Sequence, residues 1–505
     1  IDAKGASDET ANKEGVENSR LQNVMTELEE IKRQGVLETE NKASDINVTE
    51  KKAPPEGFAK NYPTRSNKLP KIIGVFIGLA ALLIIVFLVL KLKSYQTTLF
   101  GKKGEIIWWG IEHDEVVYQP LIDEFEKVNP DIKIVYKKQS PQDYRQRLSS
   151  SLVSEKGPDI FEIHQSWIPM FTKELSLLPE SIMKGVDYKN SFYPVITSGT
   201  TTSKGIVAMP LEYDAITLYI NEDIFTTAVK KPPETWAELK DLVNPKIEGS
   251  LTIRDKNSKI IQSGIALGTT ENIDYWPEII SLMLYQNRVN LAKPDDILAS
   301  YAMSFYKDFS ALGVWDTTLP NSTNAFAQGQ LAMYFGTSKS AKDIVKENPN
   351  LRFRTVKLPQ LPKNQPTDPD FSYSTLWVQS VWEKSINKEA AWTFLKYLAE
   401  NGSLERLNKN IEKYEMFQIP YPRPEMNVSF RDDKILGSIV ALVLDAKSWY
   451  LADKTNDGED GINSRLKKEF KEILDNWKKD SWQKTLLGLS GNIMVILSDY
   501  NISAK

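Results

Sequence analysis

An uninterrupted apolar stretch near the N-terminal end places the strongest constraint on this chain. It runs from Ile72 to Leu90 (IIGVFIGLAALLIIVFLVL) and contains no charged residue. At about 1.5 Å per helical residue, a stretch of this length can cross a hydrocarbon layer about 30 Å thick. A cleaved signal peptide would have a shorter apolar core and a cleavage site of small residues, whereas Lys91 and Lys93 follow here. The sequence therefore predicts one transmembrane helix over 71–92.

The residues before this helix have the composition of a disordered tail. Segment 1–70 is rich in Glu, Lys, Asn, Ser and Thr and poor in aromatic residues, so it cannot bury enough apolar surface to offset the entropy of ordering the chain. Basic residues flank the apolar stretch on both sides, so the positive-inside rule gives no orientation. A short linker over 93–103 follows the helix, and the residues that could bind or catalyse come after it.

Composition argues against several classes of function. The chain has 505 residues, more than one hydrophobic core usually organises, so we expect more than one lobe. Its 63 basic and 67 acidic residues nearly balance, which gives no electrostatic reason to expect a nucleic-acid partner. The absence of cysteine excludes disulfides and thiolate metal ligands. The sequence contains no GxSxG, HExxH or glycine-rich phosphate-loop motif, so we do not expect an enzyme.

From residue 104 onward the hydrophobic pattern becomes that of an α/β protein. Short apolar strands alternate with amphipathic helices, which indicates βαβ units and a largely parallel sheet covered by helices. Ligands bind beyond the C-terminal ends of the strands in such sheets, so the loops after Trp109 and Ile163 are the first candidate binding segments. The predicted elements are strand 105–109, helix 118–128, strand 131–137, helix 144–153 and strand 159–163.

Several longer segments occur in a collinear order between Gly104 and Glu425. They are EIIWWG with LIDEFEKVNPDIKI, GPDIFEIHQSWIPMF, VAMPLEYDAITLYINEDIF, KPPETWAEL, NAFAQGQLAMYFGTS and KEAAWTFLKYLAE. This set resembles the extracellular solute-binding proteins of bacterial ABC importers, family 1, the maltose- and oligosaccharide-binding type. The resemblance implies an α/β, two-lobed periplasmic-binding-protein-like fold of type II, with the ligand in the cleft between the lobes.

The resemblance also implies how the chain is divided between the lobes. The two-lobed domain would span 104–505, with lobe one formed by 104–212 and 371–425 and lobe two by 213–370 and 426–505. The crossings would fall near 210–215, 359–369 and 420–424, and the last two of these stretches are rich in proline. Closure of two rigid lobes around such a hinge would bury the ligand.

The resemblance places polar binding groups in the loop after the first strand. These are Glu112, His113 and Asp114, of which the two carboxylates could accept bidentate hydrogen bonds from vicinal hydroxyls. Asp114 could equally cap the helix that follows, a common role of short acidic side chains.

Further candidate positions follow the third strand and the first crossing. Asp214 aligns with an acidic residue that binds a ligand hydroxyl in many family members, and a solvated hinge carboxylate is the alternative. Trp167 either lines the cleft or belongs to the core of lobe one. The matching positions after the third strand are His164, Gln165, Ser166 and Trp167.

Aromatic residues bear on whether the ligand is a sugar. Thr337 and Ser338 follow LAMYF, where carbohydrate binders often have an aromatic platform, and no aromatic residue occurs at this turn. An aromatic surface could come instead from Trp377, Trp449 and Tyr450, whose rings can stack on a pyranose face. Aromatic residues at helical spacing are more often part of a core, so both interpretations stay open here.

Two possible metal sites have weak support. The segment DKTNDGEDG begins like a calcium loop at Asp453, but Ser464 occupies position twelve, where such a loop needs a bidentate glutamate. The only two histidines, His113 and His164, could hold a transition metal together with Asp114 and Asp214, although ordinary hydrogen-bonding roles are expected. We expect no metal and no cofactor.

These observations predict a membrane-tethered extracellular solute-binding protein. It would capture a small solute, a carbohydrate, in the cleft and deliver it to the permease subunits of an ABC transporter. The domain after the helix would face outward, with the tail in the cytoplasm. One alternative is an extracellular sensor or adhesion receptor with the same fold. The other is a surface glycosidase that uses Glu112 and Asp214 as its two carboxylates.

Overall fold

The computed structural model describes residues 104–363, 365 and 367–503. The predicted tail over 1–70, transmembrane helix over 71–92 and linker over 93–103 lie outside these residues. Within the described part of the chain, no helix is both long enough and apolar enough to cross a bilayer.

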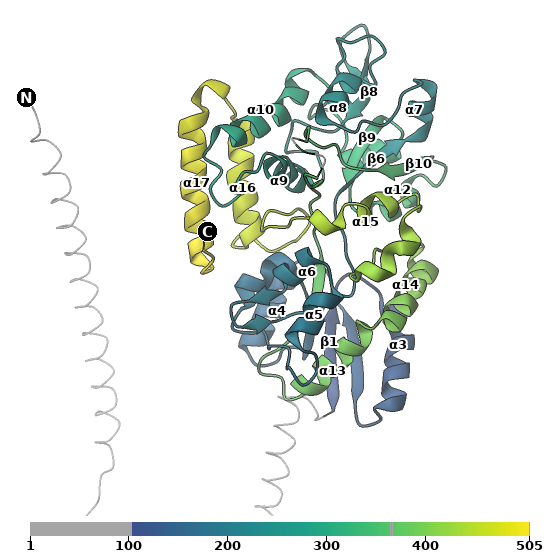
Figure 1. The fold of residues 1–505 in the computed structure, drawn as a ribbon, viewed down its shortest axis with the longest axis vertical. Coiled ribbons are helices and arrows are strands. Elements are labelled where there is room, and N and C mark those ends of the chain that lie inside the picture. The colour runs from purple at the N-terminus through teal and green to yellow at the C-terminus, as the bar shows by residue number, and fades with distance from the viewer. Residues whose placement is uncertain (1–103, 364, 366, 504–505) are drawn as a thin grey trace, which may run out of the picture. The chain divides into compact units, whose positions relative to one another are not determined.

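The first lobe is built on a four-stranded mixed sheet (Figure 1). Its strands, in sheet order, are β11 (Trp377–Val381), β3 (Ile160–His164), β1 (Glu105–Gly110) and β2 (Lys133–Lys138). β1 pairs in parallel with β2 and β3, whereas β11 runs antiparallel to β3. All five residues of β3 are buried, as expected of a strand covered on both faces. The three strands predicted at the start of this domain are confirmed to within two residues at each end.

Helices pack around this sheet. They are α3 (Glu115–Val128), α4 (Tyr144–Val153), η1 (Gln165–Phe171), α5 (Gly185–Ser191), α6 (Pro194–Gly199), α13 (Lys388–Leu398) and α14 (Asn401–Glu415). A hairpin of β4 (Thr201–Thr202) and β5 (Gly205–Ile206) follows α6. The two predicted helices are confirmed, although α3 begins three residues earlier than its apolar pattern suggested. α3 buries Leu121 and Phe125 at helical spacing and packs against α14 and β2.

The second lobe contains a five-stranded mixed sheet. Its strands, in sheet order, are β10 (Phe353–Val356), β6 (Thr217–Asn221), β9 (Leu331–Gly336), β8 (Ile260–Ile265) and β7 (Ile253–Arg254). β6 and β9 are antiparallel and fully buried, and β8 runs parallel to β9. β9 is the strand LAMYFG, so the turn that follows it comes directly out of the centre of the sheet.

The helices of the second lobe include the C-terminal end of the described chain. α16 and α17 pack against each other, and α17 also contacts α10 (Figure 1). The helices are α7 (Glu222–Thr227), α8 (Trp236–Val243), α9 (Trp276–Gln286), α10 (Ile297–Ala311), α11 (Ser322–Ala327), α12 (Ser340–Glu347), α16 (Ile462–Asp475), η4 (Lys479–Ser481) and α17 (Trp482–Asp499).

Two extended segments carry the chain between the lobes side by side. Ile216 N donates to the carbonyl of Tyr373 at 3.0 Å, and Thr375 N donates to the carbonyl of Asp214 at 3.1 Å. Lys447 lies on the other side of the second segment and pairs with it in parallel. The hinge is therefore a small, hydrogen-bonded sheet of three backbone segments.

Two of the crossings lie later in the chain than the proline-rich stretches suggested. Gln360 pairs with Thr235 inside the second lobe, and Pro420 accepts from the backbone N–H of Tyr213 at the edge of the first. Proline cannot donate a ladder hydrogen bond, whereas the hinge is built from such bonds, so its strands fall on proline-free segments. The chain between Pro420 and the third crossing contains η2 (Pro424–Phe430), α15 (Gly437–Val440) and η3 (Val443–Asp445).

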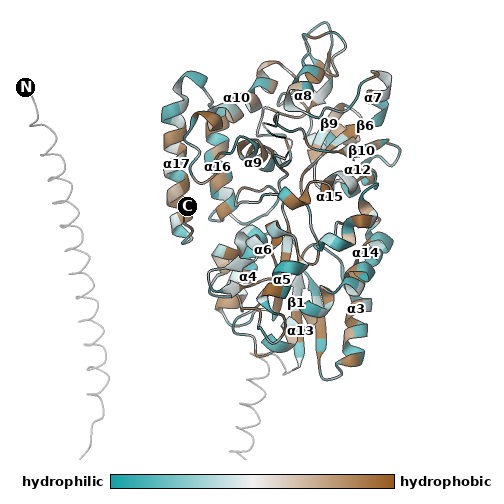
Figure 2. Ribbon diagram, in the orientation of Figure 1, coloured by the Kyte–Doolittle hydropathy of each residue, from teal (hydrophilic) through white to brown (hydrophobic). Residues whose placement is uncertain are grey.

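Each lobe has its own hydrophobic core. At the first crossing, Ala215 belongs to the core of the first lobe and Ile216 to that of the second. At the second crossing, Tyr373 belongs to the core of the second lobe and Leu376 to that of the first. Ile439 and Val443 pack in the first core, although their segment was expected in lobe two, because α15 and η3 lie at the junction of the lobes. Figure 2 shows hydrophobic residues along the strands of both sheets. Two separate cores joined by a narrow hinge are the arrangement that permits rigid-body closure.

Candidate functional site

A buried glutamate organises the loop that follows β1. Glu162, in the middle of β3, accepts hydrogen bonds from Ile111 N at 2.6 Å and Glu112 N at 3.0 Å. Its other oxygen accepts from Gln379 Nε2 at 3.0 Å. Burial, followed by repulsion from Glu112, raises the pKa of the Glu162 carboxyl. The sequence carried a signal for this residue, because Glu162 is an acidic side chain between apolar neighbours in a buried strand.

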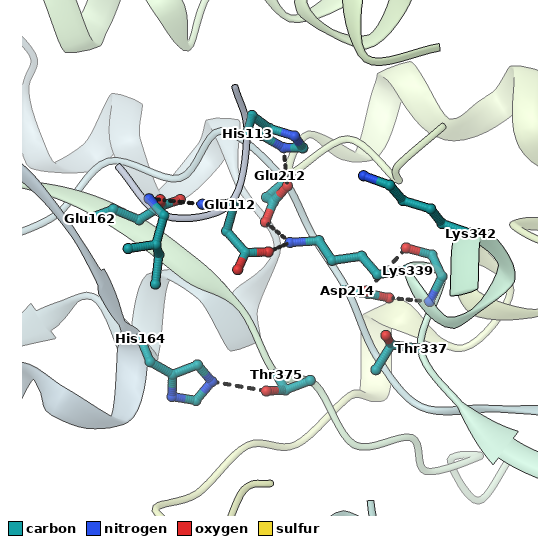
Figure 3. Close-up of polar contacts among 12 residues, drawn as sticks. Glu112, His113, Glu162, His164, Glu212, Asp214, Thr337, Lys339, Lys342 and Thr375 are labelled. Carbon is teal, nitrogen blue, oxygen red and sulfur yellow. Dashed lines mark hydrogen bonds and ion pairs between the residues drawn. The ribbon is translucent and has the colours of Figure 1, made fainter. Parts of the chain in front are cut away.

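The loop and the second lobe are joined by a series of alternating charges, of which Figure 3 labels Glu112, Lys339, Glu212, His113 and Lys342. Lys339, in the turn between β9 and α12, contacts Glu112 and lies 2.6 Å from Glu212 Oε1. His113 lies between Glu212 and Glu415, at 3.3 Å and 3.2 Å. Lys342 of α12 is the last member of this series of charges, and its Nζ lies 2.9 Å from Glu415 Oε2. We call this set the charge chain; its members, in order, are Glu112, Lys339, Glu212, His113, Glu415 and Lys342.

The charge chain fixes the protonation states of its members. Burial by itself lowers the pKa of His113, but hydrogen bonds to Glu212 and Glu415 outweigh it and raise that pKa to about 9. Burial opposes ionisation of Glu415, yet His113 and then Lys342 lower its pKa to about 2. Burial also opposes ionisation of Glu212, but the attraction of Lys339 and the hydrogen bond from His113 outweigh it and lower the pKa of Glu212. At neutral pH His113 is therefore an imidazolium between two carboxylates.

Of the predicted site residues, Glu112 and His113 belong to the charge chain, whereas Asp114 lies outside it. Asp114 is exposed at the N-cap position of α3 without making a side-chain cap hydrogen bond, and its carboxylate lies 3.5 Å from Lys138 Nζ. The sequence pattern did not reveal Glu212, Glu415, Lys339 or Lys342, which come from three separate segments, with Lys339 and Lys342 both at the start of α12.

Asp214 is buried, and its carboxylate is hydrogen-bonded to neighbouring residues of the protein. Its carboxylate accepts from Ser338 N at 2.9 Å, Ser338 Oγ at 3.0 Å and Ala215 N at 2.9 Å. Burial raises the pKa of Asp214 to about 6, against the attraction of Lys339. Thr337 is also buried, and its carbonyl accepts from the Tyr219 hydroxyl at 2.6 Å. Asp214 and Ser338 are thus partners of one another, and Thr337 beside them is bonded to Tyr219 rather than free to bind a solute.

A second hydrogen-bonded chain joins the lobes at His164. Its Nε2 lies 2.9 Å from Thr375 Oγ1, and its Nδ1 lies 2.6 Å from Ser166 Oγ. Ser166 Oγ accepts from Asn463 Nδ2 of the second lobe at 2.6 Å. Burial, reinforced by the nearby charge of Lys339, lowers the pKa of His164 to about 3, so the ring is neutral.

The acidic segment before α16 supports this second chain. Both carboxylate oxygens of Asp457 accept hydrogen bonds at the start of α16, from Asn463 N at 2.7 Å and from Ser464 Oγ at 2.6 Å. Asp457 therefore bonds the first turn of α16 and orients Asn463. Among residues 104–503 that the structure describes, no group of three His, Cys, Asp or Glu side chains is placed to hold a metal ion.

A cavity of about 930 Å³ lies between the lobes beside this second chain. From the first lobe, the lining residues include Gln165, Ser166 and other residues of η1, together with the hairpin after α6. From the second lobe, Trp449 and Tyr450 line it, with the C-terminal end of α17. The Trp449 and Tyr450 rings are 5.9 Å apart and inclined at 55°, and both side chains are partly buried.

The remaining two predicted aromatic residues do not line this cavity. Trp167 is fully buried in the first core, which decides its role in favour of packing. Trp377 packs edge-on against His164 and Trp167, at ring distances of 5.3 and 5.2 Å. Four predicted site residues therefore line the cavity: Gln165, Ser166, Trp449 and Tyr450.

Two lobes with separate cores, a three-segment hinge and a cavity between the lobes define a two-lobed periplasmic-binding-protein-like fold. Residues 111–404 match the family model of bacterial extracellular solute-binding proteins. The chain belongs to this family. The family consists of binding proteins, not enzymes, and the carboxylates proposed for a glycosidase contact Lys339 and Ser338 instead.

Comparisons with individual proteins agree with this assignment. A putative binding protein of Brucella abortus (strain 2308) is 23% identical over 330 residues, which cover 64% of this chain and 77% of the relative. The cyclic α-maltosyl-1,6-maltose binding protein of Arthrobacter globiformis superposes with a TM-score of 0.63 at 17% identity, covering 79% of this chain and 100% of that one. An ABC transporter solute-binding protein of Thermotoga lettingae, bound with α-D-tagatose, superposes with a TM-score of 0.59 at 21% identity. This match covers 78% of this chain and 100% of that one. At these identities the structural matches establish the fold alone.

Proposed function

We propose that this protein is a membrane-tethered extracellular receptor that captures a carbohydrate between its lobes and delivers it to an ABC permease. The observation that carries the proposal is the cavity lined by Trp449 and Tyr450 opposite Gln165 and Ser166. Aromatic rings can cover the apolar face of a sugar ring, while amide and hydroxyl groups bond its hydroxyls. A cavity of this size is within the range that holds small-molecule ligands.

The fold and the comparisons support the carbohydrate class. The Thermotoga lettingae structure is bound with α-D-tagatose, and the Arthrobacter globiformis protein binds a cyclic maltosyl-maltose. The hinge supports capture by closure, because its three backbone segments are hydrogen-bonded while the cores on either side are independent. A closed, solute-filled form would differ in shape from an open one, and a permease could recognise that difference.

Ligand binding can be tested on the full chain in detergent micelles. All twelve tryptophans lie after residue 104, so intrinsic fluorescence reports on the described domain alone. A panel of monosaccharides, oligosaccharides, polyols and short peptides should give a rise in Tm only with certain sugars, because a ligand that binds the folded state stabilises it by mass action. Titration calorimetry should then give one site per chain. A response to peptides alone would overturn the carbohydrate class, and no response to any member would overturn the proposal.

Tethering needs a separate experiment. We propose that the segment from Ile72 to Leu90 is the anchor, with the domain outside and the tail inside the cell. The chain has no cysteine, so a single cysteine introduced at Ser7 or at the exposed Val153 can be labelled specifically. A membrane-impermeant maleimide should label intact cells at position 153 but not at position 7. The reverse pattern would show the opposite orientation, and recovery of the chain in the soluble fraction would exclude the anchor.

A further inference from the structure

Lys339 places a cation between two carboxylates that belong to other parts of the molecule. It contacts Glu112, from the loop after β1, and lies 2.6 Å from Glu212, which precedes the first crossing. The side chain of Lys339 is 25% exposed, and those of Glu112 and Glu212 are 19% and 8% exposed. All three charges are therefore largely removed from water, and each depends on the others for compensation.

The position of this cation is where a solute would otherwise be expected. The loop after β1 lies at the C-terminal edge of a parallel strand pair, the edge at which such sheets bind ligands. A solute in this part of the cleft would have to donate hydrogen bonds to the same carboxylate oxygens that Lys339 occupies (Figure 3). Lys339 comes from the second lobe, so its contact with Glu112 also spans the cleft.

We infer that Lys339 is a specificity-determining residue that takes the place of a ligand's donor groups between Glu112 and Glu212. It closes this end of the cleft to solute, so that binding is confined to the cavity at Trp449 and Tyr450. It also holds the lobes together at this end when no solute is bound. The inference concerns the charge chain alone and is independent of whether the solute is a sugar.

Removing the lysine would create a site for a small cation. Lys339→Ala deletes the atoms from Cγ to Nζ, which have the shape of n-propylammonium, and leaves two poorly hydrated carboxylates without compensation. Lys339→Met removes the charge but keeps most of the volume. The alanine variant should therefore accept a primary ammonium ion, whereas the methionine variant should not.

Thermal unfolding of the full chain, followed by tryptophan fluorescence, tests this expectation. Lys339→Ala should have a lower Tm than the wild type, and n-propylammonium chloride should raise it saturably by about 2 °C or more relative to equal sodium chloride. The wild type, Lys339→Met and Lys346→Ala, an exposed lysine on α12, should show no such rise. Neutral 1-propanol should have no effect on any of them. An equal response of all variants to the amine would overturn the inference.

The distance between the lobes provides a second test. Since the chain has no cysteine, the exposed Val128 and Ala237, one in each lobe, can be replaced by cysteine and labelled with a fluorophore pair. In Lys339→Ala the interlobe distance without solute should be longer than in the wild type and should shorten when n-propylammonium is added. Lys339→Met, which removes the charge but keeps most of the volume, should lengthen it as well because the contact with Glu112 is lost, a measurement that stands even if Lys339→Ala does not fold.

The outcomes separate this inference from the proposed function. A selective amine response in Lys339→Ala, with no response of the wild type to any sugar, would support the role of Lys339 and overturn carbohydrate capture. Sugar binding by the wild type, with an interlobe distance that neither Lys339→Ala nor Lys339→Met changes, would support carbohydrate capture and overturn the role of Lys339.

Discussion

The two ends of the cleft differ in how their polar groups are satisfied. At the end next to the first crossing, the charge chain pairs every member with an opposite charge from another segment. At the other end, neutral side chains such as Gln165 and Ser166 meet two aromatic rings around an open cavity. The first end is a completed ion-pair network, whereas the second is a cavity lined by rings and by amide and hydroxyl groups.

This difference teaches that acidic residues near a predicted cleft are not by themselves binding groups. Paired carboxylates are costly to uncouple, because removal of one partner leaves the other buried and charged. Neutral groups around a cavity lose little free energy when a solute replaces water, because the solute can take over the hydrogen bonds that water made. Changes at the first end should therefore alter stability and its pH dependence, and changes at the second should alter affinity.

The largest expected effect is the pH dependence contributed by His113. Its pKa in the folded state, about 9, exceeds the ordinary value of 6.5. Its protonation therefore stabilises the folded state fully below pH 6.5, and this contribution is lost as the pH rises through 9. The free energy of unfolding should fall by up to about 3 kcal/mol over this range. Urea unfolding of the wild type and of His113→Gln at pH 6.5 and 9.5 measures the difference. Equal losses in the two proteins would contradict the assignment of the charge to His113.

Next in size is the loss of affinity in Trp449→Ala. Truncation of a ring that covers the solute should weaken binding of the sugar found in the panel by about 30-fold, or about 2 kcal/mol. Calorimetry gives the Kd, and urea unfolding shows whether the variant is folded. Tyr301→Ala on α10, an exposed aromatic residue, is the control and should bind normally. An unchanged Kd in Trp449→Ala would remove this end of the cleft from consideration as the pocket.

Asp214→Asn tests the residue that the resemblance placed in the site. Since its carboxylate bonds Ser338 and Ala215, the substitution should cost about 1 kcal/mol of stability and change sugar affinity by less than about threefold. The same calorimetry and urea unfolding apply. A loss of affinity above tenfold with unchanged stability would show instead that Asp214 contacts the solute.

The smallest expected effect belongs to the ion pair at the edge of the cavity. Arg145, whose side chain is 12% exposed, contacts Asp460, whose side chain is 77% exposed. A pair with one partner in water contributes little, because water and salt screen it. Asp460→Asn should lower the free energy of unfolding by about 0.5 kcal/mol, and by less at high salt. A loss above about 2 kcal/mol would show that Arg145 depends on Asp460 as a buried charge does.

Local pattern was enough for the elements that open the domain. β1, β2, β3, α3 and α4 could be predicted because each follows from periodicity over consecutive residues, which is set by backbone geometry. The two-lobed fold and the family followed from collinear segments. The first crossing was also predicted correctly, near 210–215. The other two hinge segments were not, because they are defined by pairing between residues far apart in the sequence, such as Asp214 with Thr375.

The site divides in the same way. The sequence by itself determined that polar residues follow β1 and β3 and that Trp449 and Tyr450 are adjacent, since these are facts of order along one segment. Only the tertiary structure decided that Glu112 and Asp214 have internal partners and that Lys339 lies between Glu112 and Glu212. The physical reason is that charge compensation depends on distances between side chains, and the residues that meet here come from segments that folding alone brings together.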